Sequence, residues 1–177
     1  MRRGFVLHAR RTAISLITLS ITLSAVANGA TGMTTVILVR HAEKVADETL
    51  KDPPLTADGQ SRAKELARML GNAGVTAIYT TPWERTRQTA APLATALRVQ
   101  PLEIKTGPTY ANEVASIIRA KHAGSTVLIV GHSNTTGDVI RALGIAGAPE
   151  IPDAEYDNLF VVTLAEGSEP ALLKLKF

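Results

Sequence analysis

An arginine and a histidine end an apolar, β-branched segment of this sequence. The run 35–39 stops at Arg40 and His41, and a second apolar run, 126–130, is followed one residue later by His132. Runs of this length are typical of buried strands, and open α/β sheets bind their ligands at the carboxyl ends of strands. Imidazole and guanidinium groups placed there favour nucleophilic or acid–base chemistry on an anion. A surface histidine after a strand is the alternative for either motif taken alone.

A second arginine, Arg85, belongs to a segment that has the features of a helix start. Thr81 with Glu84 fits a capping box, and Pro82 fits the first helical position, so we expect a helix that runs to about Leu97. Arg85 then lies in the first turn, where free backbone N–H groups already favour an anion. Two arginines and two histidines that converge on one point would suit the oxygens of a phosphoryl group.

The elements expected around these residues alternate between strands and helices. We expect strands at 35–39, 75–79, 99–104, 126–130, 159–164 and 172–177, and helices at 57–70, 82–97, 112–122 and 135–143. This alternation predicts a single three-layer α/β domain, with a mostly parallel central sheet and helices on both faces. The last two strands are expected to form a hairpin. Because parallel strands present their carboxyl ends at one edge, the residues named above can converge.

The first 27 of the 177 residues have the features of an export signal. Arginines at 2, 3, 10 and 11 precede an apolar stretch at 14–26, and Ala25-Val26-Ala27 fits a small-residue cleavage site. We predict a signal peptide at 1–27 and a catalytic domain at 28–177, exported to the periplasm or beyond by the Sec or the twin-arginine route. The stretch is shorter than the ~20 residues of a spanning helix, so we expect no stable membrane insertion after cleavage, although an uncleaved anchor is the alternative.

Removal of this signal changes the charge balance. The chain has 19 Lys and Arg against 16 Asp and Glu, and four of the basic residues lie in the signal, so 19 − 4 leaves 15 against 16 and the net charge moves from +3 to −1. We therefore expect neither a nucleic-acid partner nor an acidic membrane partner. The chain has no Cys, which excludes disulfides and a lipidated cysteine. The sequence indicates no cofactor and leaves the oligomeric state open.

Three motifs in order resemble the histidine phosphatase superfamily, which includes the cofactor-dependent phosphoglycerate mutases. Arg40-His41 is similar to the opening motif of that family, residues 79–90 to its second arginine motif, and residues 130–133 to its Gly-His motif. The resemblance extends over about 35–164 and points to a small secreted branch similar to phosphohistidine phosphatases. It implies a phosphoglycerate mutase-like fold.

The resemblance also implies a role for each matching side chain. His41 would attack phosphorus and become a phosphohistidine, which water then cleaves. Arg40, Arg85 and His132 would hold the phosphoryl oxygens. Phosphoryl transfer depends mainly on positioning and charge stabilisation, which these side chains can supply. Further candidate contacts with the substrate are Lys44 and Ser133.

The proton donor for the leaving oxygen is the open point of this interpretation. Many members of the family carry an acid after the third strand, and Glu113 is the best-placed candidate there, with Glu43 and Asp52 as rivals. Without an acid, good leaving groups or phosphoramidates become the favoured substrates. The stretch between Glu103 and Glu113 is too short for a large lid. A mutase must keep water from its phosphoenzyme, so hydrolysis is favoured.

The sequence therefore predicts a metal-independent phosphohydrolase that acts on small phosphomonoesters. The alternatives are a protein phosphohistidine phosphatase and a non-catalytic phosphate- or phosphosugar-binding protein of the same fold. A serine-hydrolase elbow at 131–135 is disfavoured, because Thr135 replaces its last glycine and no histidine follows His132. A metal site at His41, Glu43 and His132 is disfavoured because the arginines would repel a cation.

Overall fold

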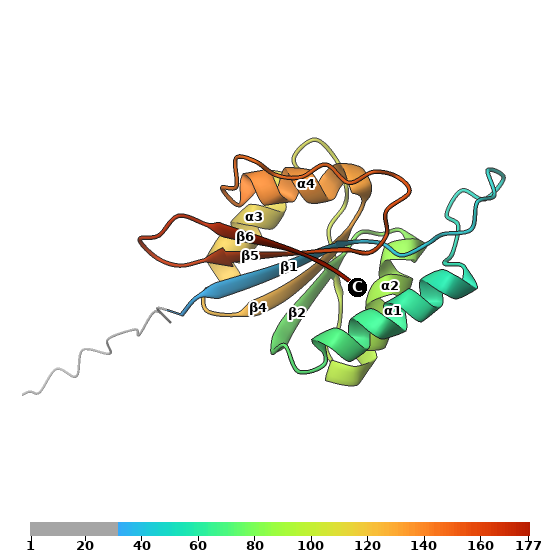
Figure 1. The fold of residues 1–177 in the computed structure, drawn as a ribbon, viewed down its shortest axis with the longest axis horizontal. Helices are drawn as coiled ribbons and strands as arrows, with labels where there is room; N and C mark the ends of the chain where they lie inside the picture. The colour runs from blue at the N-terminus through green and yellow to red at the C-terminus, as the bar shows by residue number, and fades with distance from the viewer. Residues whose placement is uncertain (1–31) are drawn as a thin grey trace, which may run out of the picture.

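A six-stranded sheet with helices on both faces forms the protein (Figure 1). The computed structural model describes residues 32–177. Its strands are β1 (Thr34–Arg40), β2 (Val75–Thr80), β3 (Leu102–Glu103), β4 (Thr126–Gly131), β5 (Asn158–Leu164) and β6 (Ala171–Lys176), and its helices are α1 (Ala57–Leu70), α2 (Glu84–Leu97), α3 (Tyr110–Lys121) and α4 (Ser133–Ala142). The strand order is β3-β2-β4-β1-β5-β6, and only the pairs that involve β5 are antiparallel. The expected three-layer α/β architecture and the terminal hairpin are confirmed.

The unbroken apolar run of β1 reflects burial of the strand on both faces. Val36 and Leu38 pack into the core under α3 and α4, whereas Ile37 and Val39 pack into the core under α1 and α2. Successive side chains of a strand point to opposite faces, so a strand covered on both sides needs an apolar residue at every position. The run ends at Arg40, a buried side chain that contacts the loop before β5.

The pairing of β1 with β4 places the two histidine motifs side by side. In the parallel register Val39 lies opposite Val130 and Arg40 opposite Gly131. The backbone N–H of His41 then donates to the Gly131 carbonyl oxygen at 2.9 Å. A slip of one residue would turn every side chain of β1 to the other face, so the buried pattern of the strand fixes this register.

Several predicted boundaries differ from the structure. The expected strand 99–104 is reduced to the two residues of β3, where Pro101 has no N–H to donate and Leu102 is half exposed at the sheet edge. Helix α3 begins at Tyr110 and α4 at Ser133, each two residues before the expected start. The early start of α4 leaves His132 as the single residue between β4 and the helix.

The predicted capping box at the start of α2 is wrong. The helix begins at Glu84 after Trp83, whose side chain makes no cap, and both carboxylate oxygens of Asp52 accept from the Glu84 N–H at 3.0 Å. Asp52 belongs to the loop after β1, so this cap is a tertiary contact that local spacing cannot reveal. The hydroxyl group of Thr81 is engaged elsewhere, by His132 and Thr86.

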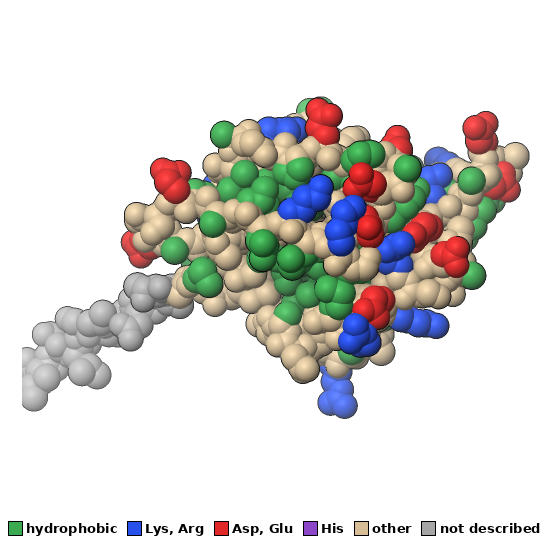
Figure 2. All heavy atoms as spheres, in the orientation of Figure 1, with side chains coloured by type: hydrophobic (Ala, Val, Ile, Leu, Met, Phe, Trp, Pro, Cys, Tyr) green, Lys and Arg blue, Asp and Glu red, His purple; other side chains and the backbone are tan. Residues whose placement is uncertain are grey.

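One face of the described domain carries charges of both signs. On the face seen in Figure 2, Lys and Arg side chains lie among Asp and Glu side chains. Among residues 32–177, no helix is long and apolar enough to cross a membrane. The predicted signal peptide, 1–27, lies outside the described residues.

Candidate active site

A cavity of about 470 Å³ opens at the carboxyl ends of β1 and β4. Its lining consists of Arg40, His41, Lys44, Trp83, Arg85, Thr106, His132, Ser133, Asn134, Thr135, Asp153 and Tyr156. It therefore contains every predicted catalytic or binding residue except Glu113. A cavity of about 520 Å³ beside the end of α2 is larger, but no histidine lines it. The chemistry of the side chains, more than cavity size, identifies the site.

His41 is held in the tautomer that a nucleophile requires. Its side chain is buried, and Nδ1 lies 2.7 Å from the carbonyl oxygen of Ala42. Because a carbonyl oxygen can only accept a hydrogen bond, Nδ1 carries the proton and Nε2 keeps its lone pair. The backbone of His41 is thus fixed by Gly131, and its side chain is fixed by Ala42.

Both imidazoles of the cavity are neutral at pH 7. Burial is the main cause that lowers the pKa of His41 to about 3; the Ala42 carbonyl opposes this, and the charges of His132, Arg40 and Arg85 add to it. Burial and the two arginines likewise lower the pKa of His132 to about 4. The two rings meet edge to face with their centroids 5.4 Å apart. One phosphoryl group is small enough to contact both rings.

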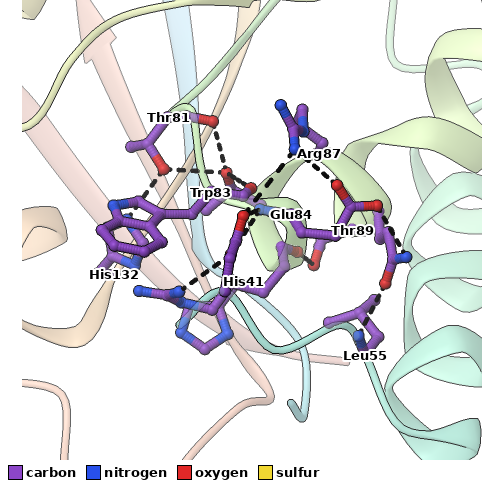
Figure 3. Close-up of polar contacts among 12 residues, drawn as sticks. His41, Leu55, Thr81, Trp83, Glu84, Arg87, Thr89 and His132 are labelled. Atoms are coloured by element: carbon purple, nitrogen blue, oxygen red, sulfur yellow. Dashed lines mark hydrogen bonds and ion pairs between the residues drawn. The ribbon is translucent and has the colours of Figure 1, made fainter. Parts of the chain in front are cut away.

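A chain of hydroxyl groups orients His132 (Figure 3). Thr81 Oγ1 lies 3.0 Å from His132 Nε2 and 3.0 Å from Thr86 Oγ1. The Thr86 hydroxyl donates to the backbone carbonyls of Thr81 and Trp83, so Thr81 must donate to Thr86 and accept from His132. Nε2 of His132 therefore carries its proton.

We expect Thr81→Val to destabilise the protein. The variant leaves the Nε2–H group of His132 buried without an acceptor, which costs about 1–3 kcal/mol. Urea unfolding followed by the fluorescence of Trp83, the one tryptophan of the chain, measures this loss. Thr81→Ser keeps the hydroxyl group and should stay close to the wild type. A Thr81→Val variant as stable as the wild type would contradict the hydroxyl chain.

Arg40 connects the end of β1 to the loop between α4 and β5, residues 143–157. Its Nη1 donates to the backbone carbonyls of Pro152, Asp153 and Glu155 at 2.7–3.2 Å. Its guanidinium carbon lies 4.1 Å from the centre of the Tyr156 ring. Nε is buried and has no protein partner. Nη1 of the guanidinium group thus anchors the loop, whereas the Nε–H donor has no hydrogen-bond acceptor in the protein.

Arg85 enters the cavity from the first turn of α2. It stacks on Trp83 at 4.7 Å, and its Nη1 lies 3.7 Å from a carboxylate oxygen of Asp52. Burial lowers the pKa of Arg85, an effect that Asp52 opposes and Arg40 reinforces. Its Nε is also buried without a protein partner. Buried donors are normally paired, and each of these two arginines of the cavity keeps a buried Nε–H without a partner; with the two imidazoles, they make the cavity suited to an anion.

The three carboxylates proposed as proton donors lie elsewhere or are engaged. Glu113 lies on the exposed first turn of α3 and does not line the cavity. Glu43 is bound by Arg62 at 2.7–2.9 Å; burial acts to raise the pKa of Glu43, but these hydrogen bonds lower it overall. Asp52 caps α2 and pairs with Arg85. The structure therefore brings none of the three to the cavity as an unengaged acid.

The carboxylate that does line the cavity is Asp153, which sequence reasoning missed. It lies in the Pro-rich loop 143–157, together with Tyr156. The sequence shows only that this segment is a loop, and its path over the site depends on the contacts with Arg40. Among residues 32–177, no three His, Cys, Asp or Glu side chains are grouped as a metal site would need.

The buried neutral histidines make the stability depend on pH. The folded pKa values, about 3 for His41 and about 4 for His132, lie below the unfolded value of 6.5. The unfolded chain binds more protons in this interval. The stabilisation that the two neutral histidines contribute is therefore fully present above pH 6.5 and is lost as the pH falls towards 4 and 3. Between pH 6.5 and 5 we expect a loss of about 2 kcal/mol per histidine.

Urea unfolding at pH 7, 6 and 5 in a buffer without phosphate measures this dependence. The variant His41→Gln removes one titrating ring and should show a shallower fall over the same interval. A free energy of unfolding that does not change between pH 7 and 5 would contradict burial of neutral imidazoles.

Comparison with protein-family models gives a match over part of the chain. Residues 36–107 match the family described as the histidine phosphatase superfamily (branch 1). The matched segment contains Arg40, His41 and Arg85 and ends before His132. A search of curated protein sequences finds no significant match.

Solved structures share the fold over most of the chain. The protein histidine phosphatase SixA complexed with tungstate has a TM-score of 0.66 at 19% identity, covering 80% of this chain and 96% of that one. YhfR from Bacillus stearothermophilus has 0.63 at 20% identity, covering 78% and 95%. A mycobacterial glucosyl-3-phosphoglycerate phosphatase has 0.58 at 14% identity, covering 79% and 97%. At this level of identity the similarity shows a common fold, which confirms the phosphoglycerate mutase-like architecture.

Proposed function

We propose that this chain is a phosphohydrolase of the histidine phosphatase superfamily, and that it cleaves phosphomonoesters through a phosphohistidine on His41. The observation that carries the proposal is the pair of buried, unpartnered Nε–H groups of Arg40 and Arg85 beside a neutral imidazole. Nδ1 of this imidazole is hydrogen-bonded to the Ala42 carbonyl oxygen, which leaves Nε2 as the nucleophile. The family match over 36–107 and the shared fold support the same reaction class.

The cavity supplies what phosphoryl transfer needs. Nε2 of His41 attacks phosphorus, while Arg40, Arg85 and His132 balance the charge on the phosphoryl oxygens. Lys44 adds a further positive charge to the lining. These groups provide the charge that a metal ion provides in other phosphatases, so we propose that the reaction is independent of metal. Water reaches the open cavity, which favours hydrolysis over transfer to a second substrate.

Hydrolysis of p-nitrophenyl phosphate tests the proposal, because this leaving group needs little protonation. We expect turnover by the wild type that persists after treatment with a metal chelator. A wild type that binds inorganic phosphate but does not turn over p-nitrophenyl phosphate would instead be a non-catalytic phosphate- or phosphosugar-binding protein. If chelation abolished the activity and a divalent metal restored it, the proposal of metal independence would be wrong, but the proposal of a phosphohydrolase would stand.

A protein phosphohistidine phosphatase is the second candidate. The fold is similar to that of SixA, which is named a protein histidine phosphatase. The loop between β3 and α3 is short, so the open cavity can admit a side chain that projects from a protein surface. The ratio of kcat/KM for a phosphohistidine-containing protein to kcat/KM for small phosphomonoesters distinguishes the two. A ratio well above one favours the second candidate.

We also propose that the protein is exported, and that its substrates are phosphorylated compounds of the cell envelope. The arginines, apolar stretch and Ala25-Val26-Ala27 site of the first 27 residues support export. Cell fractionation followed by N-terminal sequencing tests this, with a mature chain beginning at residue 28 as the expected result. Full-length protein in the cytoplasmic fraction would contradict it.

A further inference from the structure

We propose that Asp153 is the catalytic acid that protonates the leaving oxygen and then accepts a proton from water. This assignment rests on the proposed function. Asp153 is the one carboxylate in the lining of the cavity that contains His41, among the residues that the structure describes. Its position in the loop before β5 differs from the sequence expectation, which placed the acid after the third strand.

Asp153 contacts Ser133 and Arg40, two residues that we expect to bind the substrate. Ser133 Oγ donates to its Oδ1 at 2.9 Å, and Arg40 Nη2 lies 3.6 Å from the same oxygen. Its backbone carbonyl accepts from Arg40 Nη1 at 2.7 Å, so the chain at this residue is anchored to the end of β1. A phosphoryl group bound by Arg40 would therefore lie beside the carboxyl group of Asp153.

Exposure and position suit this carboxyl group to proton transfer. The Asp153 side chain is 91% exposed, so it exchanges protons readily with solvent between turnovers. Arg40 and Ser133 hold this exposed carboxyl group at the edge of the cavity, where a leaving oxygen can reach it. Glu43 and Asp52 do not line the cavity, because Arg62 and the start of α2 hold them outside it.

The two steps balance as follows. The lone pair of His41 Nε2 forms the N–P bond as the P–O bond to the leaving group breaks, and the leaving oxygen takes the proton of the Asp153 carboxyl group. An alcohol departs, and Asp153 is left as a carboxylate. Water then attacks phosphorus, the electron pair of the N–P bond returns to Nε2, and Asp153 takes one proton from the water. Inorganic phosphate leaves, and the enzyme returns to its starting state.

Two substrates of the same shape but different leaving groups test this role. Asp153→Asn should lower kcat/KM by about 10²-fold for phenyl phosphate, whose leaving oxygen needs a proton, and by less than about 10-fold for p-nitrophenyl phosphate. The comparison uses kcat/KM because this quantity reports only the steps up to departure of the leaving group. Glu150→Gln, an exposed carboxylate in the same loop and outside the cavity, is the matched control and should leave both values unchanged.

Each other outcome overturns the assignment. An equal loss for both substrates would show that Asp153 acts on the phosphoryl site in general and not on the leaving group. If Asp153→Asn lost no activity with either substrate, Asp153 would not be the catalytic acid. If Glu113→Gln showed the selective loss for phenyl phosphate instead, the acid would be Glu113. A wild type that hydrolyses neither compound would overturn the proposed function itself. Urea unfolding of Asp153→Asn confirms that the variant is folded before these values are compared.

Discussion

His41→Ala is expected to reduce turnover of p-nitrophenyl phosphate by at least about 10⁴-fold, the scale of loss when a covalent nucleophile is removed. No second imidazole can replace it, because His132 is fixed through Nε2 to Thr81 and its ring approaches His41 edge to face. The remaining arginines can still bind phosphate but provide no atom for the covalent step. Initial rates at saturating substrate measure the effect.

Trapping of the intermediate separates loss of the nucleophile from loss of the fold. Rapid acid quench of the wild type during turnover should give a phosphorylated protein, and mass spectrometry of its peptides should place the phosphoryl group on His41. The variant His41→Ala should give no labelled peptide yet retain inorganic phosphate binding. A label on His132, or activity within tenfold of the wild type, would contradict the assignment of the nucleophile.

The sheet and the side chains of Arg40, His41 and His132 could be predicted because strand burial sets both. The run before Arg40 is apolar at every position since β1 is covered on two faces, and this pattern predicts the strand and its end. The run before His132 predicts β4 in the same way. Once both strands are parallel neighbours, their carboxyl ends coincide, so the site follows from the fold.

The supporting residues could not be predicted because their roles are tertiary. Thr81 has the spacing of a helix cap, but its hydroxyl group contacts His132, which is 51 positions away in the chain. By sequence Asp52 is a candidate acid, but in the structure its carboxylate caps the start of α2. Asp153 is an ordinary loop residue by sequence, and contacts with distant residues, above all the three carbonyl contacts of Arg40, bring its loop to the site.

The two arginines should differ in what their loss does to stability. Arg85→Ala should lower kcat/KM at least about 10²-fold, the scale of a lost oxyanion donor. Its free energy of unfolding should stay within about 1 kcal/mol of the wild type, because the ion pair with Asp52 is long, at 3.7 Å, and partly exposed to water. Arg40→Ala should lose as much activity and also about 2 kcal/mol of stability, because backbone carbonyls of the loop 143–157 lose their donor.

Paired measurement of kcat/KM and urea unfolding distinguishes these two roles. Arg87→Ala is the matched control, since Arg87 lies in the same helix turn as Arg85 but is outside the cavity that contains His41. Arg87 pairs with Glu84 and Glu103 and, at 4.0 Å, with Asp52, so this variant also tests the effect of removing one cation from Asp52. This control should change activity by less than about threefold, as expected for exposed ion pairs. If Arg85→Ala kept near-normal activity, Arg85 would be removed from the oxyanion site. If Arg40→Ala were as stable as the wild type, anchoring of the loop by Arg40 would be wrong, and with it the contact that places Asp153 beside the phosphoryl group.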